Sequence, residues 1–297
     1  KAQAKFYLQQ AGQSFDGIET AHEKHQAVLK KVRQAIPNTI KSQVVGREFV
    51  PRFMFGEDDL VITVGQDGLV SNTAKYLSGQ PILAVNPDPD RFDGILLPFT
   101  TDTVEKQLYL TLYGSREHEQ MYMQQVTLAE ARMEDGQSLL AFNDFFVGTS
   151  SHVSARYSIE IGSRQENQSS SGIFVSTGAG STGWLQSVYA GAAGVVESLG
   201  GKVIPPPNGG RLPWDSDELV YSVREPFPSR ATQVSIVHGK VTREMPLRLT
   251  SQMPTNGVIF SDGIEDDYLE FNSGAELTIG TAGKKATLIV PITETRH

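Results

Sequence analysis

The stretch that decides the fold reads Asp59-Leu60-Val61-Ile62-Thr63-Val64-Gly65-Gln66-Asp67-Gly68. It begins with a short apolar run rich in β-branched residues, which is typical of a strand buried on both faces in a parallel sheet. The run ends at Gly65, where the chain can turn sharply and point backbone N–H groups at phosphate oxygens. A helix that begins there adds a favourable dipole. The stretch therefore predicts the strand and turn of an α/β nucleotide-binding unit.

The segments around this strand complete an α/β pattern. A second apolar run spans residues 81–86, and the chain between the two runs, residues 69–77, is long enough for a short helix. Residues 18–36 carry apolar side chains at helical spacing, and a further helix is expected at residues 103–112. We therefore predict an N-terminal Rossmann-like α/β domain over residues 1–114.

After about residue 115 the pattern changes to short alternating segments separated by Gly, Asn and Asp turns. Strands at such spacing are typical of an antiparallel sandwich or barrel. We predict an all-β, antiparallel β-sandwich domain over residues 115–297. Its expected strands lie at residues 157–161, 172–175, 219–223, 233–237, 247–250, 257–260, 276–279 and 286–290.

The composition excludes several classes of function. Lys and Arg number 26 against 34 Asp and Glu, and the net charge of −8 argues against a broad nucleic-acid surface. No apolar run approaches the roughly 20 residues that span a membrane, so we expect a soluble protein without a membrane partner. The absence of Cys removes disulfides, Cys-ligated zinc and thiol nucleophiles, and it fits a reducing compartment.

The first residues, Lys1 to Leu8, contain neither an initiator Met nor the apolar region of a signal peptide. We expect that another segment precedes Lys1. That segment should contain the first strand of the α/β sheet.

The turn Gly65-Gln66-Asp67-Gly68 is the first motif that could carry chemistry. Asp67 would stand at the carboxyl end of a buried strand, where open α/β sheets bind ligands. Its carboxylate could accept the proton of a hydroxyl group that attacks phosphorus. Taken alone, Gly-x-Asp-Gly is most often a plain turn, because Gly and Asp tolerate left-handed backbone.

A second motif is a loop rich in glycine and hydroxyl groups. It follows the predicted strand at residues 172–175 and reads Ser176-Thr177-Gly178-Ala179-Gly180-Ser181-Thr182-Gly183-Trp184. Its glycines allow close backbone approach, its hydroxyl groups supply donors and acceptors, and Trp184 could stack on a base. Such a loop suits a ribose and a diphosphate, and a flexible turn before a helix is an equal alternative.

A third motif is the polar pair Asn143-Asp144, which interrupts the apolar stretch at residues 141–146. An amide beside a carboxylate can bind the two vicinal hydroxyls of a ribose. Taken alone, the pair is better explained as a turn between two strands. Arg224, at the end of a predicted strand, could bind a phosphate, although a surface ion pair is the usual role of such an Arg.

In order and spacing, these motifs resemble the NAD kinase family, and more closely its mitochondrial-type branch and similar bacterial proteins. Residues 65–69 match the family's Gly-Gly-Asp-Gly-Thr, and Asn143-Asp144 falls where the family has Asn-Glu. The resemblance spans about residues 58–290. Its other matches are residues 81–91, Ser170-Ser171-Gly172, Thr177-Gly178-Ala179-Gly180-Ser181 with Trp184, Val223-Arg224-Glu225-Pro226 and Asp262-Gly263.

The resemblance implies that ATP phosphorylates the 2′-hydroxyl on the adenosine ribose of NAD to give NADP, at a site between the two domains of a homodimer. Asp67 would activate this hydroxyl. Magnesium would accompany ATP, and no separate metal site is expected. The expected compartment is the bacterial cytoplasm, or the mitochondrial matrix in a eukaryote. The implied binding residues are Gly65, Gln66 and Gly68 for phosphate and Asn143, Asp144, Ser171, Thr177, Gly180, Ser181 and Trp184 for NAD, with Arg224 and Asp262 as further candidates.

Departures from the family pattern keep other functions open. Gln66 places a side chain where the family lets phosphate approach the backbone, and Leu69 removes a hydroxyl from the same loop. One alternative is therefore a degenerate kinase fold that senses NAD(H) or NADP(H). Another alternative is a lipid or sphingoid kinase of the same superfamily. Asn143-Asp144 and Trp184 argue against it, because they suit a ribose and a base better than an alkyl chain. The phosphate donor and the preference for NAD over NADH stay open.

Overall fold

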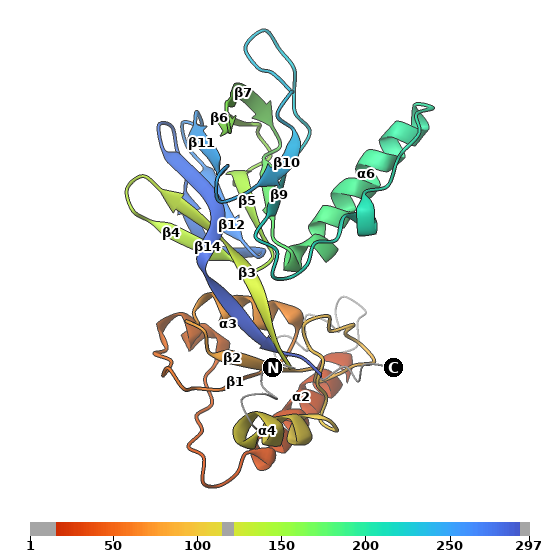
Figure 1. Cartoon of the computed structure of the whole chain (residues 1–297), viewed down its shortest axis with the longest axis vertical. Helices are drawn as coiled ribbons and strands as arrows, with labels where there is room; N and C mark the ends of the chain where they lie inside the picture. Colours follow the sequence, from red (N-terminus) through yellow and green to blue (C-terminus); the bar gives the residue numbers. More distant parts are fainter. Residues whose placement is uncertain (1–15, 115–121, 292–297) are drawn as a thin grey trace. The chain divides into compact units, whose positions relative to one another are not determined.

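The computed structural model describes residues 16–114 and 122–291 (Figure 1). The segment from Lys1 to Leu8 lies outside the described residues. The chain divides into two compact units. The first comprises Lys1–Thr73, Gln80–Gln124 and Leu288–His297, and the second comprises Ala74–Gly79 and Gln125–Thr287.

The first unit is built on two parallel strands, β1 (Val61–Val64) and β2 (Pro81–Val85). The predicted helix between them is α3 (Asp67–Lys75), whose last two residues are counted with the second unit. The helices α2 (Asp16–Ala35) and α4 (Val104–Tyr113) pack together, and Figure 1 shows them on one side of the strands. The core of this unit contains Val28, Val32, Leu83, Val85 and Leu108. The predicted strand–turn–helix–strand pattern is confirmed.

The second unit consists of two packed sheets. Their strands are β3 (Met123–Met133), β4 (Ser138–Ala141), β5 (Asp144–Thr149), β6 (Ala155–Ile161), β7 (Arg164–Ser170), β8 (Ile173–Ser176), β9 (Leu219–Val223), β10 (His238–Val241), β11 (Leu247–Ser251), β12 (Gly257–Ser261), β13 (Ile264–Glu270) and β14 (Glu276–Ile289). One sheet has the order β10-β9-β8-β5-β12-β13 and is antiparallel. In the other, β14, β11, β6 and β7 are successive neighbours, and β3 pairs with β14 and β4.

Apolar side chains from both sheets form the core of the second unit. Phe145 and Ile173 come from one sheet, and Tyr157, Ile159 and Leu249 come from the other. Each of these side chains is almost fully buried. The predicted fold class, an α/β part followed by an antiparallel sandwich, is therefore confirmed.

The segment after β8 contains the short 3₁₀ helix η2 (Ala179–Thr182) and the helix α6 (Trp184–Ser198). Only the beginning of α6 is well packed, where Leu185 is buried in a cluster with Phe174 and Val220. Figure 1 shows the helix leading away from the strands of its unit. No helix in the described ranges is both long and apolar enough to cross a membrane.

The predicted strand at residues 233–237 is wrong. This segment is a loop, and β10 begins only at His238. The reason is that its backbone donors have another acceptor: the N–H groups of Ser235 and Ile236 donate to Oε1 of the buried Glu166 at 3.0 and 2.8 Å. A side chain thus replaces the ladder that the alternating pattern predicts.

The predicted strands at residues 276–279 and 286–290 are also corrected. They form one continuous strand, β14, which is 14 residues long. The glycines between them, Gly280 and Gly283, do not interrupt the extended backbone. Glycine is conformationally permissive but does not force a turn, and here the strand continues through both positions.

Candidate functional site

The first part of the predicted site is the turn between β1 and α3. The N–H of Gly65 donates to the carbonyl of Val85 at 3.3 Å, and α3 begins at Asp67. Leu69 packs over Gly65, with its Cδ2 atom 3.0 Å from the place where a Cβ would stand. A side chain at position 65 would therefore require a small shift of Leu69. Gln66 is exposed at this turn.

The carboxylate of Asp67 is held by the loop that follows β2. Its Oδ1 accepts the N–H of Leu96 at 2.6 Å. The buried Asn86 organises this loop, because its amide donates to the Phe92 carbonyl at 3.0 Å and its Oδ1 accepts the N–H of Asp88 at 3.0 Å. Among the described residues, nothing donates a hydrogen bond to Oδ2 of Asp67. This oxygen can therefore accept one from a ligand hydroxyl.

The second part is the Asn143-Asp144 turn between β4 and β5, in the second unit. The carboxylate of Asp262 accepts the N–H groups of Phe142 at 3.0 Å and Asn143 at 2.6 Å. It also accepts the N–H of Asp144 at 3.3 Å. On the carbonyl side, Thr177 Oγ1 donates to Phe142 O at 2.6 Å, and Thr177 N–H donates to Asn143 O at 2.9 Å. The turn is thus fixed through its backbone from both sides.

Asp262 reaches this turn from the tip of a hairpin. Asp262 and Gly263 connect β12 to β13, with φ angles of 54° and 68°, and Ser261 pairs with Ile264 across the turn. Two-residue hairpin turns with positive φ at both positions favour Asp-Gly. The Asp262 side chain is fully buried, so this residue supplies both the turn and a buried acceptor.

A buried lysine that we did not predict completes the cluster. Lys75 Nζ donates to Ser261 Oγ at 2.7 Å and to Asp267 Oδ2 at 2.6 Å. It also lies 3.7 Å from Oδ2 of Asp262. No local pattern indicates these contacts, because the bonded partners lie 186 and 192 positions further along the chain. A lysine near the end of a predicted helix is normally solvent-exposed.

The electrostatics of the turn follow from its burial. Burial, with a further contribution from the charge of Asp262, raises the pKa of Asp144 from 3.8 to about 7. Burial also raises the pKa of Asp262, while Lys75 and the three backbone N–H groups oppose this rise. Asp144 is therefore a half-buried carboxyl group that titrates near neutral pH. When ionised, it can accept hydrogen bonds from hydroxyl groups.

The glycine-rich loop uses its hydroxyl groups inside the protein. Ser181 Oγ donates to the carbonyl of Gly178 at 2.6 Å and accepts the N–H of Leu212 at 3.0 Å. Gly180 lies so close to the Asn143 carbonyl that a Cβ would overlap it. Thr177 and Ser181 are both fully buried. Thr177 holds the loop against the turn, whereas Ser181 joins the loop to Leu212.

Trp184, Arg224 and Ser171 form a neighbouring cluster in the same unit. The guanidinium of Arg224 lies 5.5 Å from the ring centroid of Trp184, and Ser171 N–H donates to the Arg224 carbonyl at 2.9 Å. Trp184 stacks on Phe146 at 6.1 Å. Phe146 and Asp144 are two residues apart on β5, so they share one face of the sheet. An aromatic plane and a cation therefore accompany the polar turn.

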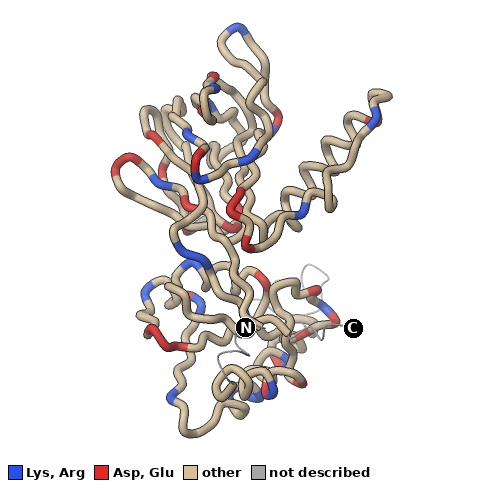
Figure 2. The backbone as a smooth tube through the Cα atoms, viewed as in Figure 1, with Lys and Arg blue, Asp and Glu red and all other residues tan. Residues whose placement is uncertain are grey.

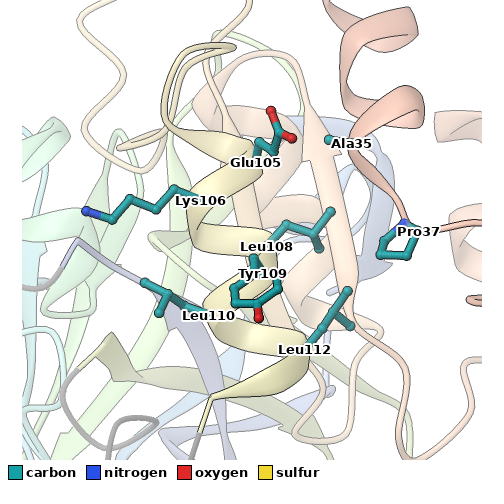
Figure 3. A pocket seen from close by; sticks show the side chains of 8 residues that line it. All are labelled: Ala35, Pro37, Glu105, Lys106, Leu108, Tyr109, Leu110 and Leu112. Atoms are coloured by element: carbon teal, nitrogen blue, oxygen red, sulfur yellow. The ribbon is translucent and has the colours of Figure 1, made fainter.

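A groove between α2 and α4 belongs to the first unit. Its volume is about 500 Å³, and Figure 3 shows mainly apolar walls, with Leu108, Tyr109 and Leu112 among the lining side chains. None of the predicted site residues lines it. The groove therefore does not contribute to the candidate site.

Within residues 16–114 and 122–291, no three His, Asp or Glu side chains gather in a way that could hold a metal ion. Magnesium is usually bound by one or two carboxylates together with substrate phosphates.

One curated protein is similar to this chain in sequence. It is a rice protein (Oryza sativa subsp. japonica) described as "Probable NADH kinase", 29% identical over 249 residues, and the match covers 74% of this chain and 69% of the rice protein. No protein-family model matches the chain.

Two solved structures are similar in fold. They are an NAD kinase from Archaeoglobus fulgidus in complex with ATP and yeast NADH kinase complexed with NADH, each with a TM-score of 0.53 and 18% identity. Each match covers 80% of this chain, with 79% of the archaeal protein and 64% of the yeast protein, which is less than two thirds of the latter. The chain has the NAD kinase fold. The resemblance to the NAD kinase family that the motifs indicate is confirmed.

Within this NAD kinase fold, the three motifs occupy corresponding positions at strand ends. Asp67 follows β1, Asn143 follows β4 and Thr177 follows β8. Residues at strand ends and in loops are free of the ladder, so a rigid scaffold can present their side chains to a ligand.

Proposed function

We propose that this protein transfers the γ-phosphoryl group of ATP to the 2′-hydroxyl on the adenosine ribose of NAD or NADH. The observation that carries the proposal is the Asn143-Asp144 turn, whose backbone is fixed by Asp262 and Thr177. Its two side chains make no hydrogen bond to any residue that the structure describes. An amide and a carboxylate so placed suit two vicinal ribose hydroxyls. The NAD kinase fold and the descriptions of the rice and yeast proteins as NADH kinases support the same class of acceptor.

Asp67 is the proposed catalytic base. Leu96 donates a hydrogen bond to one carboxylate oxygen of Asp67. The other carboxylate oxygen accepts the proton of the ribose hydroxyl while the hydroxyl oxygen bonds to the γ-phosphorus. The bond from the γ-phosphorus to the bridging oxygen breaks, and ADP leaves with the electron pair. The backbone N–H groups of Gln66, Asp67 and Gly68, at the N-terminus of α3, would bind the phosphates. If magnesium accompanies ATP, it would supply positive charge that stabilises the phosphate oxygens.

The remaining predicted residues complete the proposed NAD pocket. Trp184 supplies a plane for a base, and Arg224 supplies a cation for the diphosphate, with Ser171 beside it. Thr177, Gly180 and Ser181 contribute through the shape of their loop. We assign the phosphate loop to a domain of residues 1–114 and the NAD pocket to a domain of residues 115–297.

The proposal is tested by incubating the protein with ATP, magnesium and either NAD or NADH, and measuring NADP or NADPH. We expect product with the unaltered protein and a loss of about 10²-fold or more in Asp67→Asn, because a positioned base contributes about this much. Asp102→Asn, an exposed acid of the same unit, is the matched control. Equal rates in the unaltered protein and Asp67→Asn would remove Asp67 from the mechanism.

One structural observation favours a second candidate function. Leu69 occupies the space over Gly65 and Gln66 adds an exposed side chain, so the phosphate loop differs from the family pattern that the sequence resembles. A protein that binds NAD(H) without turnover would be a sensor. Absence of NADP and NADPH, together with a rise in melting temperature on adding NADH, would establish that function. Phosphorylation of a sphingoid base but not of NAD(H) would instead establish the lipid kinase alternative.

We also propose that the protein forms a homodimer, as the family resemblance implies. The α6 sequence has one charged residue, Glu197, and the helix is tan along most of its length in Figure 2. Val195, Val196 and Leu199 are 61%, 41% and 82% exposed. Exposed apolar surface of this kind suits a second copy across a two-fold axis. Light scattering should detect a dimer, and Val196→Lys/Leu199→Lys should shift it to a monomer.

A further inference from the structure

We propose that Lys75 is a positioning residue for the Asn143-Asp144 turn, and that it acts through the carboxylate of Asp262. The inference rests on the proposed function, in which this turn binds a ribose of NAD(H). Lys75 lies outside the motifs that carry the family resemblance. No hydrogen bond or ion pair joins it directly to the turn in the described parts of the chain.

The ammonium group of Lys75 is buried and bound by polar partners. The Lys75 side chain is 3% exposed, and a strongly hydrated ammonium is costly to bury without partners. Its partners Ser261 and Asp267 belong to the two strands of the β12–β13 hairpin, and Asp262 is at the tip between them. The cation is therefore attached to the same hairpin that supplies the acceptor for the turn.

The positive charge of Lys75 favours the ionised form of Asp262. Burial raises the pKa of Asp262, and the charge of Lys75 opposes this rise. An ionised carboxylate accepts hydrogen bonds through both oxygens, whereas a protonated one must use one oxygen as a donor. Here Oδ2 faces both Lys75 and the N–H of Phe142, and Oδ1 accepts the N–H of Asn143. Lys75 thus favours the form of Asp262 that holds the turn.

The backbone of Lys75 is held by Lys284. Lys284 Nζ donates to the carbonyls of Lys75 at 2.9 Å and Leu77 at 2.7 Å, which fixes the backbone at the end of α3. The backbone of Lys75 is therefore held independently of its ion pairs. Substitution of Lys284 would therefore disturb Lys75 as well, and the matched control is Lys240→Met, which removes a surface lysine of the same unit that pairs with Glu218.

The experiment compares Lys75→Met and Lys75→Arg with one control, Lys240→Met. Hydrogen–deuterium exchange at the amides of Phe142 and Asn143 reports the turn directly and requires no ligand. Titration with NADH at pH 8, followed by its fluorescence, reports the dissociation constant. ATP and magnesium are omitted, so neither measurement depends on catalysis.

In Lys75→Met we expect the two amides to exchange about tenfold faster and the dissociation constant for NADH to rise about tenfold, because loss of the ion pair should weaken the charge-assisted hydrogen bonds that Asp262 accepts from the turn. Lys75→Arg keeps the charge and should stay within about threefold of the unaltered protein in both measurements. Lys240→Met should leave both values close to those of the unaltered protein, whatever it does to the melting temperature.

Lys75→Met leaves the buried Asp262 carboxylate without its cation, and the variant could fail to fold for this reason. A second variant is used in that case. Lys75→Met/Asp262→Asn removes both charges, and the Asn carbonyl keeps a single acceptor. We expect faster exchange at Asn143 than in the unaltered protein. Unchanged exchange in whichever variant folds overturns the inference, as does an equal increase in Lys240→Met. An unaltered protein that binds no NADH overturns the proposed function, while the exchange data still decide whether Lys75 controls the turn.

Discussion

The backbone N–H of Leu96 donates a 2.6 Å hydrogen bond to Oδ1 of Asp67. The bond orients the carboxylate through one oxygen, and no described residue donates a hydrogen bond to the other, Oδ2. Leu96 belongs to a loop whose course depends on the buried Asn86 and on Gly94, which has a φ of 62°. The proposed base therefore owes its geometry to residues that need not contact any substrate.

Asn86→Ala should lower kcat by about tenfold with little change in the KM for ATP, because misplacing a reacting group costs rate more than binding. The loss of two hydrogen bonds should also lower the free energy of unfolding by about 1–3 kcal/mol. Steady-state kinetics well below the melting temperature of the variant separate these effects. An unchanged kcat would show that Asp67 keeps its position without the loop.

The affinity for NADH should depend on pH through Asp144. Its pKa in the free protein is raised to about 7, and the ionised form accepts hydrogen bonds from ribose hydroxyls. The dissociation constant should therefore rise by up to about tenfold per pH unit below pH 7. The charged groups around Asp144 are Asp262 and, beyond it, Lys75. Titrations from pH 5.5 to 8.5 measure the effect, and a dependence of equal size in Asp144→Asn would assign it to another group.

Gly180→Ala should destabilise the second unit, because the added Cβ would overlap the carbonyl oxygen of Asn143. Overpacking of this kind costs about 1–3 kcal/mol. Gly191→Ala is the control: nothing lies within 4 Å of the added Cβ, and the helix α6 should gain about 0.5–1 kcal/mol. Urea unfolding measures both variants, and equal stabilities would contradict the close approach of Gly180 to the Asn143 carbonyl.

Glu166→Gln should lower the free energy of unfolding by about 1–3 kcal/mol at pH 7, because an amide donor would face the donors of Ser235. Burial opposes ionisation of Glu166, but hydrogen bonds from Ser235, Ile236 and Gln168 outweigh it and lower the pKa below 4.5. The stabilisation by the folded carboxylate is therefore present above pH 4.5 and is lost as the pH falls through the lowered pKa.

Unfolding at pH 7 and at pH 3 should consequently show a large difference between Glu166→Gln and the unaltered protein only at pH 7. Glu160→Gln, at a carboxylate that pairs with Arg248 on the surface, is the control and should cost less than about 1 kcal/mol. A deficit in Glu166→Gln that is the same at both pH values would mean that its charge does not hold the loop.

The sequence predicts features that depend on neighbouring residues. An apolar run that stops at Gly65 is enough to indicate β1, the turn and α3, since each of these signals is local. The strand β7 carries no such signal. Its inward-facing residues are Glu166, Gln168 and Ser170, and Gln168 and Ser170 bond to the hydroxyl of Tyr157. A strand whose buried face is polar cannot be found from apolar alternation.

The residues of the candidate site also fall into two groups, those that local sequence indicates and those that only tertiary contacts define. Asp67, Asn143 and Asp144 are indicated by motif and resemblance, because their side chains are the kind that a ribose and a phosphate require. Lys75 is not, since its partners are distant in the sequence and only the folded hairpin brings them to it. Positioning residues of this type are defined by tertiary contacts, so a single sequence does not reveal them.

The Asn143-Asp144 turn is held entirely through main-chain atoms, so its shape does not depend on which two side chains it carries. The contacts that fix the backbone of the turn are therefore distinct from the side chains that would contact a ligand. Substitutions at these two positions can accumulate, by drift or in a designed library, without dismantling the support beneath them. Aspartate in place of the family's glutamate is one such substitution. Altered preference among nucleotides is therefore accessible here through few mutations and from a scaffold that stays folded.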